Sequence, residues 1–198
     1  MSLRSCLSIT VGAGMLLAAT PSFAALSWPT NNLPAQRALK YCADAAAVAI
    51  AEKNVTDADV ATCTKAVELA GFKADRAAAL SNRGALNFQR ANYDAAIADS
   101  TAALKLDRGM LEAMVNRGAS YLKLHRASEA EASFSSALRL APAQAAKIHF
   151  NRAMAREDMG DRVGAYADYA TASRLAPMWE QPKQQMTRFT IVRGKPIS

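Results

Sequence analysis

Apolar and small residues recur along most of this chain at spacings of three and four, which places them on one face of an α-helix. Between residues 77 and 178 the whole pattern repeats: Asn116 follows Asn82 after 34 residues, and Asn151 follows after a further 35. Each unit predicts two helices joined by a turn. The same spacing relates a small residue of the first helix (Gly84, Gly118 and Ala153), an alanine of the second (Ala96, Ala130 and Ala165) and a later leucine (Leu106, Leu140 and Leu175).

A period of 34 residues, with a small residue in the first helix and an alanine twelve positions later, resembles the tetratricopeptide repeat (TPR). The resemblance covers three units, 77–110, 111–145 and 146–178, and the extra residue of the second unit lies in the connector Pro142–Ala146. It implies an all-α fold in which antiparallel helix hairpins stack into a right-handed superhelix, a TPR solenoid, with a concave side.

Residues 25–76 predict a diverged helical hairpin ahead of the repeats. Large residues that face each other within a repeat, such as Met114 and Phe134, are 20 positions apart, and Cys42 and Cys63 are 21 apart. Facing positions satisfy disulfide geometry, so we expect a Cys42–Cys63 disulfide; two buried free thiols are the alternative. The cysteine pair, the stretch RAAALSNRG and the tail resemble exported TPR proteins of alphaproteobacteria.

The first 24 residues predict a cleaved signal peptide. Arg4 precedes an apolar run from Leu7 to Ala19, and Ser22-Phe23-Ala24 has the small-x-small pattern of a signal peptidase site. We therefore expect cleavage after Ala24 and a periplasmic protein. A retained membrane anchor is the alternative, and the protein would then associate with the membrane, although the run is shorter than the roughly 20 residues that a span needs.

The asparagine of each repeat lies two positions before the small residue. The TPR resemblance implies that the first helices line the concave groove and that Asn82, Asn116 and Asn151 project into it. An amide donates and accepts hydrogen bonds, so such a row suits the backbone of an extended peptide. Alternatively, each asparagine bonds the neighbouring repeat and stiffens the stack. Further peptide-binding candidates are the apolar groove positions Phe88, Val115, Leu122, Phe150 and Met154.

The arginine after each asparagine predicts a contact between the two helices of a hairpin. Arg83 and Asp99 are 16 positions apart, and so are Arg152 and Asp168. We expect both pairs to form partly buried ion pairs, since a guanidinium binds a carboxylate through two parallel hydrogen bonds. The second unit places Ser133 opposite Arg117, so this arginine needs another partner or points to water.

Residues 179–198 form the last predicted segment, a cap and tail. Trp179, Met186 and Phe189 suit a short helix that covers the final repeat, because terminal repeats of a solenoid need a cap. Arg188, Arg193 and Lys195 lie near an end that we expect to be frayed and basic.

The formal net charge is +7 over 198 residues, and removing residues 1–24 takes away Arg4 alone, which leaves +6. This basic balance is spread along the chain and points to no nucleic-acid partner. The chain has no catalytic triad pattern, no glycine-rich phosphate loop and no Cys/His spacing of a metal site, so we expect no enzyme, no cofactor and no metal.

The predicted function is that of a non-catalytic protein-interaction module in the periplasm, which binds an extended peptide segment of a protein in its groove. The alternative is a structural adaptor of a cell-envelope complex that uses its convex face or its basic C-terminal tail.

Overall fold

The computed structural model describes residues 33–140, 145–189, 191–192 and 195–196. The predicted signal peptide, 1–24, and residues 141–144 of the connector lie outside the described residues. The described elements are α1 (Leu33–Glu52), α2 (Asp57–Leu69), α3 (Lys73–Gln89), α4 (Tyr93–Leu106), α5 (Leu111–Lys123), α6 (Ala127–Leu138), α7 (Ala145–Asp158), α8 (Arg162–Leu175), α9 (Glu180–Met186), β1 (Ile191–Val192) and β2 (Lys195–Pro196).

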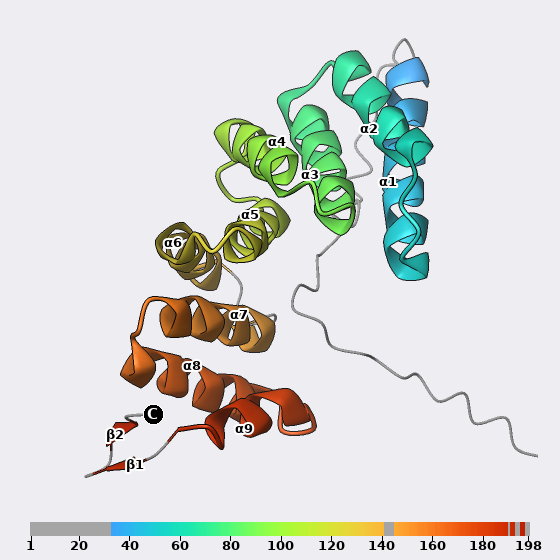
Figure 1. Cartoon of the computed structure of the whole chain (residues 1–198). Coiled ribbons are helices and arrows are strands. Elements are labelled where there is room, and N and C mark those ends of the chain that lie inside the picture. Colours follow the sequence, from blue (N-terminus) through green and yellow to red (C-terminus); the bar gives the residue numbers. More distant parts are fainter. Residues whose placement is uncertain (1–32, 141–144, 190, 193–194, 197–198) are drawn as a thin grey trace, which may run out of the picture.

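Successive helices pair into hairpins, as the repeat predicts. α1 packs on α2, α3 on α4, α5 on α6 and α7 on α8, and each hairpin packs on the next (Figure 1). Local signals set several helix ends: Thr56 and Asp59 form a capping box at the start of α2, and the Asp161 side chain accepts a hydrogen bond from the Gly164 backbone N–H at the start of α8. The predicted all-α solenoid is confirmed.

The solenoid has an inner and an outer side. α1 contacts α3, α3 contacts α5, and α5 contacts α7, so the first helices of successive hairpins lie together along the inside of the curve (Figure 1). The second helices α4 and α6 lie on the outside of the same curve. Side chains placed on α3, α5 and α7 therefore decide the character of the inner face.

The N-terminal hairpin carries the disulfide that the sequence predicts. The Cys42 and Cys63 sulfur atoms are 2.08 Å apart, and the bond joins α1 to α2. Both cysteines are fully buried, in a cluster with Ala46, Ala49 and Leu86. Small residues at this contact let the two helix axes approach closely.

The structure adds two details to the predicted organisation. α3 begins at Lys73, one turn before the predicted start of the first repeat at residue 77, because nothing in Lys73–Arg76 breaks a helix and Asp75 favours a helix N-terminus. The C-terminal end is not simply frayed, since β1 and β2 pair in an antiparallel ladder that joins Ile191 to Pro196.

α9 packs on α8 and closes the last repeat. The Phe150 and Trp179 ring centroids are 4.8 Å apart, and those of Tyr166 and Phe189 are 5.6 Å apart. Phe189 is buried in one apolar cluster with Phe150 and Tyr169, so the aromatic residues of this segment belong to a capping core.

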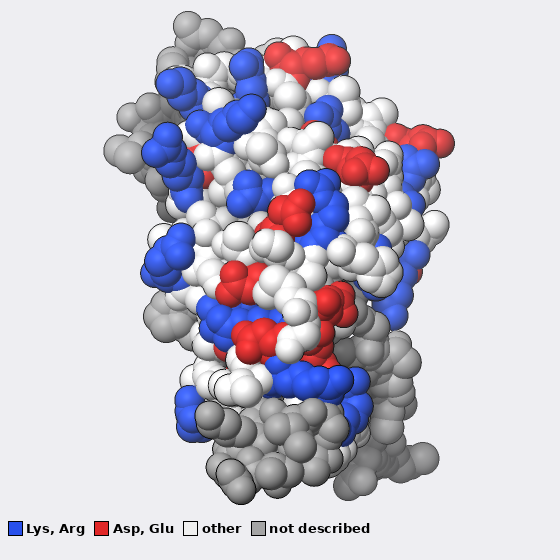
Figure 2. Space-filling model, turned by 60° about the vertical axis from the view of Figure 1, so that its left-hand side comes forward, with Lys and Arg blue, Asp and Glu red and all other residues white. Residues whose placement is uncertain are grey.

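The charged side chains do not gather in one region of the face drawn in Figure 2. Lysine and arginine lie interspersed with aspartate and glutamate over much of this face, which includes the outer side of the solenoid. No helix among the described residues has the length and hydrophobicity that crossing a membrane requires.

Candidate functional site

The asparagine row lies at equivalent places on α3, α5 and α7, the helices of the inner face. The side chains are buried: Asn82 is 3% exposed, Asn116 0% and Asn151 8%. The Asn82 Oδ1 atom has no hydrogen-bond partner, and neither amide atom of Asn116 has one. A buried polar group without a partner costs about 1–3 kcal/mol, so the side chains of Asn82 and Asn116 are energetically unsatisfied.

These contacts bear on the two interpretations of the asparagine row. None of the three side-chain amides hydrogen-bonds another described residue, although Asn116 does accept a bond from Ser120 Oγ through its backbone carbonyl. The inter-repeat bridges of the stiffening interpretation are therefore missing from the described residues. The buried position of Asn116 also means that a ligand has to displace the atoms over this amide before it can reach it.

The predicted apolar groove positions divide into two groups. Phe88 and Val115 are buried in the main core, and Leu122 packs against the same core. Phe150 and Met154, by contrast, line a pocket between α7, α8 and α9. These two predicted anchors therefore lie beside a cavity at the C-terminal end of the solenoid.

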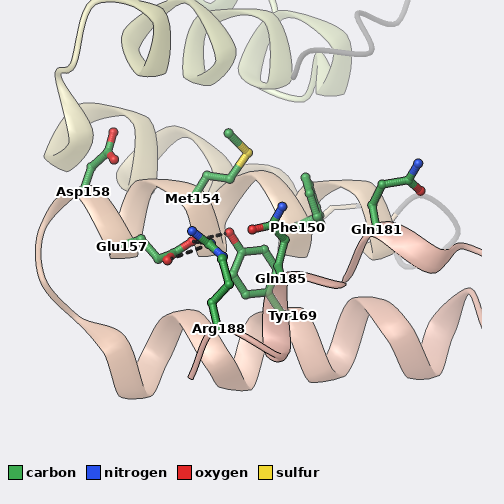
Figure 3. Close-up of a pocket in the computed structure, with 8 residues that line it drawn as sticks. All are labelled: Phe150, Met154, Glu157, Asp158, Tyr169, Gln181, Gln185 and Arg188. Atoms are coloured by element: carbon green, nitrogen blue, oxygen red, sulfur yellow. Dashed lines mark hydrogen bonds and ion pairs between the residues drawn. The ribbon is translucent and has the colours of Figure 1, made fainter. Parts of the chain in front are cut away.

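The pocket has a volume of about 360 Å³ (Figure 3). Its apolar lining comes from Phe150 and Met154 of α7 and from Tyr169 of α8. Its polar lining was not predicted from the sequence and consists of Glu157, Asp158, Gln181, Gln185 and Arg188. Glu157 and Asp158 belong to α7 itself, and Glu157 stands 35 residues after Leu122, a predicted groove position. Gln181, Gln185 and Arg188 come from α9 and the following turn, outside the repeats, so the repeat spacing gives no signal for them.

An ion pair closes one side of the pocket. Arg188 donates from Nη2 to Glu157 Oε1 at 2.9 Å and to Oε2 at 2.7 Å, and the Tyr169 hydroxyl donates to Oε2 at 2.6 Å (Figure 3). Burial and the acceptor Glu157 raise the pKa of Tyr169 far above its ordinary value. Tyr169 therefore stays a protonated donor, and the negative charge of Glu157 is already neutralised by Arg188.

The predicted ion pairs within the hairpins are present. Arg83 donates from Nε and Nη2 to the two oxygens of Asp99 at 3.0 and 2.6 Å, and Arg152 binds Asp168 in the same manner at 2.8 Å through both nitrogens. Each arginine also reaches the preceding hairpin through Nη1, to Thr64 Oγ1 in the first case and to Ser135 Oγ in the second. The pairs thus join helices within a hairpin and between hairpins.

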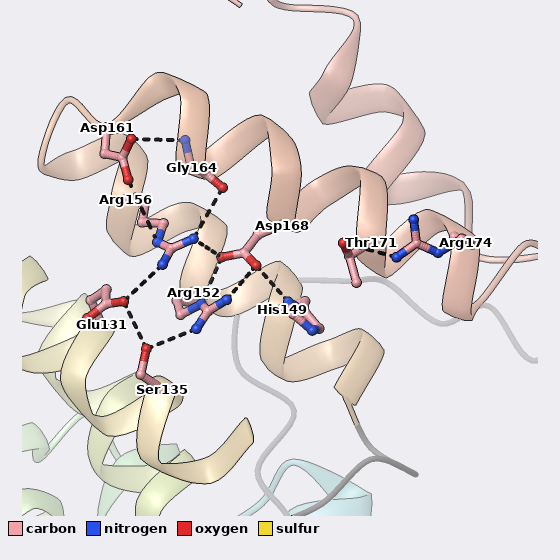
Figure 4. A network of polar contacts seen from close by, with 10 residues as sticks. All are labelled: Glu131, Ser135, His149, Arg152, Arg156, Asp161, Gly164, Asp168, Thr171 and Arg174. Atoms are coloured by element: carbon pink, nitrogen blue, oxygen red, sulfur yellow. Dashed lines mark hydrogen bonds and ion pairs between the residues drawn. The ribbon is translucent and has the colours of Figure 1, made fainter. Parts of the chain in front are cut away.

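Asp168 is the centre of a larger network (Figure 4). Besides Arg152, it contacts His149 Nδ1 at 2.6 Å and accepts from Arg156 Nη1 at 2.9 Å, and Arg156 continues to Glu131 of α6 at 3.2 Å. Burial raises the pKa of the Asp168 carboxyl, but the hydrogen bonds from Arg152 and His149 outweigh it and hold the pKa below its ordinary value. The network is a structural tie, since its members satisfy one another.

The second repeat lacks such a pair. Arg117 donates from Nε to Ser133 Oγ at 3.2 Å, and Ser133 in turn donates to the Glu129 carbonyl. Arg117 is half-buried and makes no ion pair with a described residue. Ser133, which the sequence places opposite Arg117, is therefore its hydrogen-bond partner, and it accepts the bond through a neutral hydroxyl.

The described residues contain no group of three or more histidine, cysteine, aspartate or glutamate side chains arranged to hold a metal ion. The two histidines have different structural positions. His125 has a positive φ of 56° in the turn after α5, and His149 belongs to the Asp168 network.

Comparison with known proteins identifies the type of helical solenoid. Residues 111–144 match the family model described as tetratricopeptide repeat, and this segment covers all but the last residue of the second predicted unit, 111–145. The TPR domain of Arabidopsis OM64 superposes with a TM-score of 0.57 at 23% identity, covering 59% of this chain and 95% of that domain. The fold is a TPR solenoid.

Two further structures resemble the TPR solenoid of this chain. The second TPR domain of human RPAP3, solved in complex with the HSP70 peptide SGPTIEEVD, gives a TM-score of 0.53 at 27% identity and covers 55% of this chain and 90% of that domain. MamA (41-end) from Desulfovibrio magneticus RS-1 gives 0.65 at 15% identity, over 75% of this chain and 81% of MamA. A search among curated proteins gave no significant match.

Proposed function

We propose that this TPR solenoid is a non-catalytic interaction module that is exported to the periplasm and binds an extended segment of a protein partner along its inner face. The observation that carries the proposal is the unpaired asparagine row. Asn82, Asn116 and Asn151 stand at equivalent places on the inner helices, and none of their amides bonds another described residue. A peptide backbone offers one N–H donor and one C=O acceptor per residue, and these groups can serve as hydrogen-bond partners for the asparagine amides.

Two further observations support this proposal. The pocket lined by Phe150 and Met154 belongs to α7, the helix that also carries Asn151, so this helix offers a cavity for an apolar side chain of the partner. A TPR domain of the same fold, from human RPAP3, has been solved with a bound peptide. The partner's backbone has to displace the atoms over Asn116, and the unsatisfied amide lowers the cost of doing so by about 1–3 kcal/mol.

The triple variant Asn82→Ala, Asn116→Ala, Asn151→Ala tests the proposal. A partner is first identified by pull-down from envelope extract and mass spectrometry, and its affinity for both proteins is then measured by calorimetry. Three neutral hydrogen bonds contribute about 0.5–1.5 kcal/mol each, so we expect affinity to fall by one to three orders of magnitude. The Tm should stay unchanged or rise, because the amides have no partner in the free protein and alanine is the better helix former.

A matched control replaces Asn54 and Asn92, which are exposed on turns, by alanine. Asn92 makes no side-chain capping bond, so this variant should change neither affinity nor Tm. A lower Tm with unchanged affinity in the triple variant would support the stiffening interpretation instead. Affinity that survives the triple variant but is lost when the tail after Phe189 is deleted would support the adaptor alternative.

Export is tested separately by N-terminal sequencing of the protein from a periplasmic fraction. We expect a first residue of Ala25, since Ser22-Phe23-Ala24 fits a signal peptidase site. An intact Met1 in the membrane pellet would contradict both cleavage and free periplasmic localisation.

A further inference from the structure

The outward stripe of α7 changes from apolar to acidic along the pocket. Phe150, Met154 and Asp158 are spaced by four residues and all line the pocket, so they succeed one another along one face of the helix. Four residues advance about 6 Å along a helix axis. The pocket therefore offers an apolar floor at one end and a carboxylate at the other, about one helical turn from Met154.

The Asp158 carboxylate is the uncompensated charge of this pocket. Glu157 is neutralised by Arg188, whereas Asp158 is exposed and makes no hydrogen bond or ion pair with a described residue. Figure 3 shows its carboxylate pointing away from Arg188. The three charged groups that line the pocket thus leave a net negative charge at its rim, although the chain as a whole carries +7.

The opposite wall supplies unpaired amides. Gln181 and Gln185 of α9 lie one turn apart and line the pocket across from α7 (Figure 3). Neither side chain hydrogen-bonds another described residue. Their amides are therefore free to hold the backbone of a chain that runs between α7 and α9.

From these contacts we propose that the α7–α9 pocket selects a peptide in which a bulky apolar residue and a lysine or arginine are two positions apart. Side chains two positions apart on an extended chain point the same way and are about 6.6 Å apart, which matches the one turn between Met154 and Asp158. The apolar side chain fills the cavity over Phe150 and Met154, and the basic side chain pairs with Asp158. This inference rests on the proposed binding of an extended segment and specifies the segment's chemistry.

Fluorescence anisotropy with labelled nine-residue peptides tests the proposal on the full mature chain. A glycine–serine host carries Leu-Ser-Lys at its centre, and the comparison peptides carry Lys-Ser-Leu, Leu-Ser-Glu and Ala-Ser-Lys. We expect one of the two leucine–lysine orders to bind best. Replacing leucine by alanine should weaken it about tenfold or more, since it empties an apolar pocket. Replacing lysine by glutamate should weaken it by about fivefold, and this difference should shrink in high salt.

The variant Asp158→Lys should reverse the preference, so that Leu-Ser-Glu binds better than Leu-Ser-Lys. Asp158 is the last residue of α7, where a cation is favourable for the helix, so this variant should fold normally. Glu52→Lys is its matched control, because Glu52 is an exposed carboxylate and the last residue of α1. The control should keep the original preference. Met154→Trp, which fills the cavity from a partly exposed position, should remove the preference for leucine over alanine.

The outcomes separate this inference from the proposed function. Binding of all peptides with equal affinity, or a charge preference that Asp158→Lys leaves unchanged, would overturn the inference and leave the groove proposal standing. If no peptide binds to the wild-type protein and the triple asparagine variant keeps its affinity for the partner, the results contradict both the groove proposal and the inference about the pocket.

Discussion

The second and third repeats hold the same arginine in different surroundings. In the third hairpin, Arg152 faces Asp168 and forms two charged hydrogen bonds within a network that extends to Glu131 of the preceding hairpin (Figure 4). In the second, Arg117 faces Ser133 through one neutral bond. Four residues later along the first helix, the third repeat has Arg156 and the second has Tyr121, so the second hairpin lacks the whole ionic group.

Apolar packing replaces charge in the second repeat. Phe134 of α6 is fully buried, and its ring lies so close to Gly118 that a Cβ added there would be 2.7 Å from the ring. The first repeat, which has the ion pair, has Ser100 at the place of Phe134. The third repeat has both contacts, since the fully buried Tyr169 occupies the place of Phe134 and the Arg152–Asp168 pair lies beside it. The second repeat differs because it has the aromatic contact without an ion pair at this position.

The largest expected effect is from Asp168→Ala. The change leaves Arg152 and Arg156 partly buried beside an empty site, and breaking a buried ion pair from one side costs about 3–5 kcal/mol. Ser133→Ala, its counterpart in the second repeat, removes one neutral bond worth about 0.5–1.5 kcal/mol. Urea unfolding followed by circular dichroism measures both. Equal losses in the two variants would contradict the proposed difference between the repeats.

The disulfide extends the comparison to the N-terminal hairpin, which has a covalent tie. Reducing the bond between Cys42 and Cys63, 21 residues apart, should lower the free energy of unfolding by about 3 kcal/mol through the entropy of the unfolded chain. Urea unfolding with and without a phosphine reductant measures the loss. The double variant Cys42→Ser, Cys63→Ser should not respond to reductant; if it responds as the wild type does, the effect has another source.

Gly118→Ala tests the aromatic contact of the second repeat. The new methyl group would overlap the fully buried Phe134 ring, which has to shift to accommodate it, so we expect a loss of about 1–3 kcal/mol. At Gly84 the nearest atom is Ser100 Oγ at 3.2 Å, the end of a rotatable hydroxyl. Gly84→Ala should therefore change stability by less than about 1 kcal/mol, because the better helix propensity of alanine offsets the crowding. Thermal unfolding of both variants shows whether Gly118→Ala loses more stability than Gly84→Ala.

The smallest expected effect concerns pH. The Asp168 carboxyl has a pKa below its ordinary 3.8 in the folded protein, so the unfolded chain binds this proton first as pH falls. Stability should then be lost as pH falls from about 4 through the folded pKa, by at most about 1.4 kcal/mol per unit for one group. Asp168→Asn should show a shallower slope between pH 5 and pH 3. Ser133→Ala should keep the wild-type slope. If the wild type, Asp168→Asn and Ser133→Ala all lose stability with the same slope, the titration of Asp168 is not the cause.

Much of the scaffold could be predicted from spacing. A repeating hairpin fixes which positions of its two helices face each other, so a separation of 16 residues identified the Arg83–Asp99 and Arg152–Asp168 pairs, and a separation of 21 identified the disulfide. The candidate site was less accessible to this reasoning. Phe150 and Met154 were identified, whereas Gln181 and Arg188 were not, because they lie outside the repeats. Glu157 was missed although the repeat places it at the position of Leu122.

The sequence by itself determined the hairpins, their order and the contacts within each, because local periodicity and a constant repeat length act over a few tens of residues. Only the tertiary structure decided which of those positions are open. Exposure depends on how all neighbouring helices pack, so Asn116 became buried and unpaired while Met154 came to line a cavity. The cap likewise reaches its place through contacts 31 residues apart, between Arg188 and Glu157, which no repeat specifies.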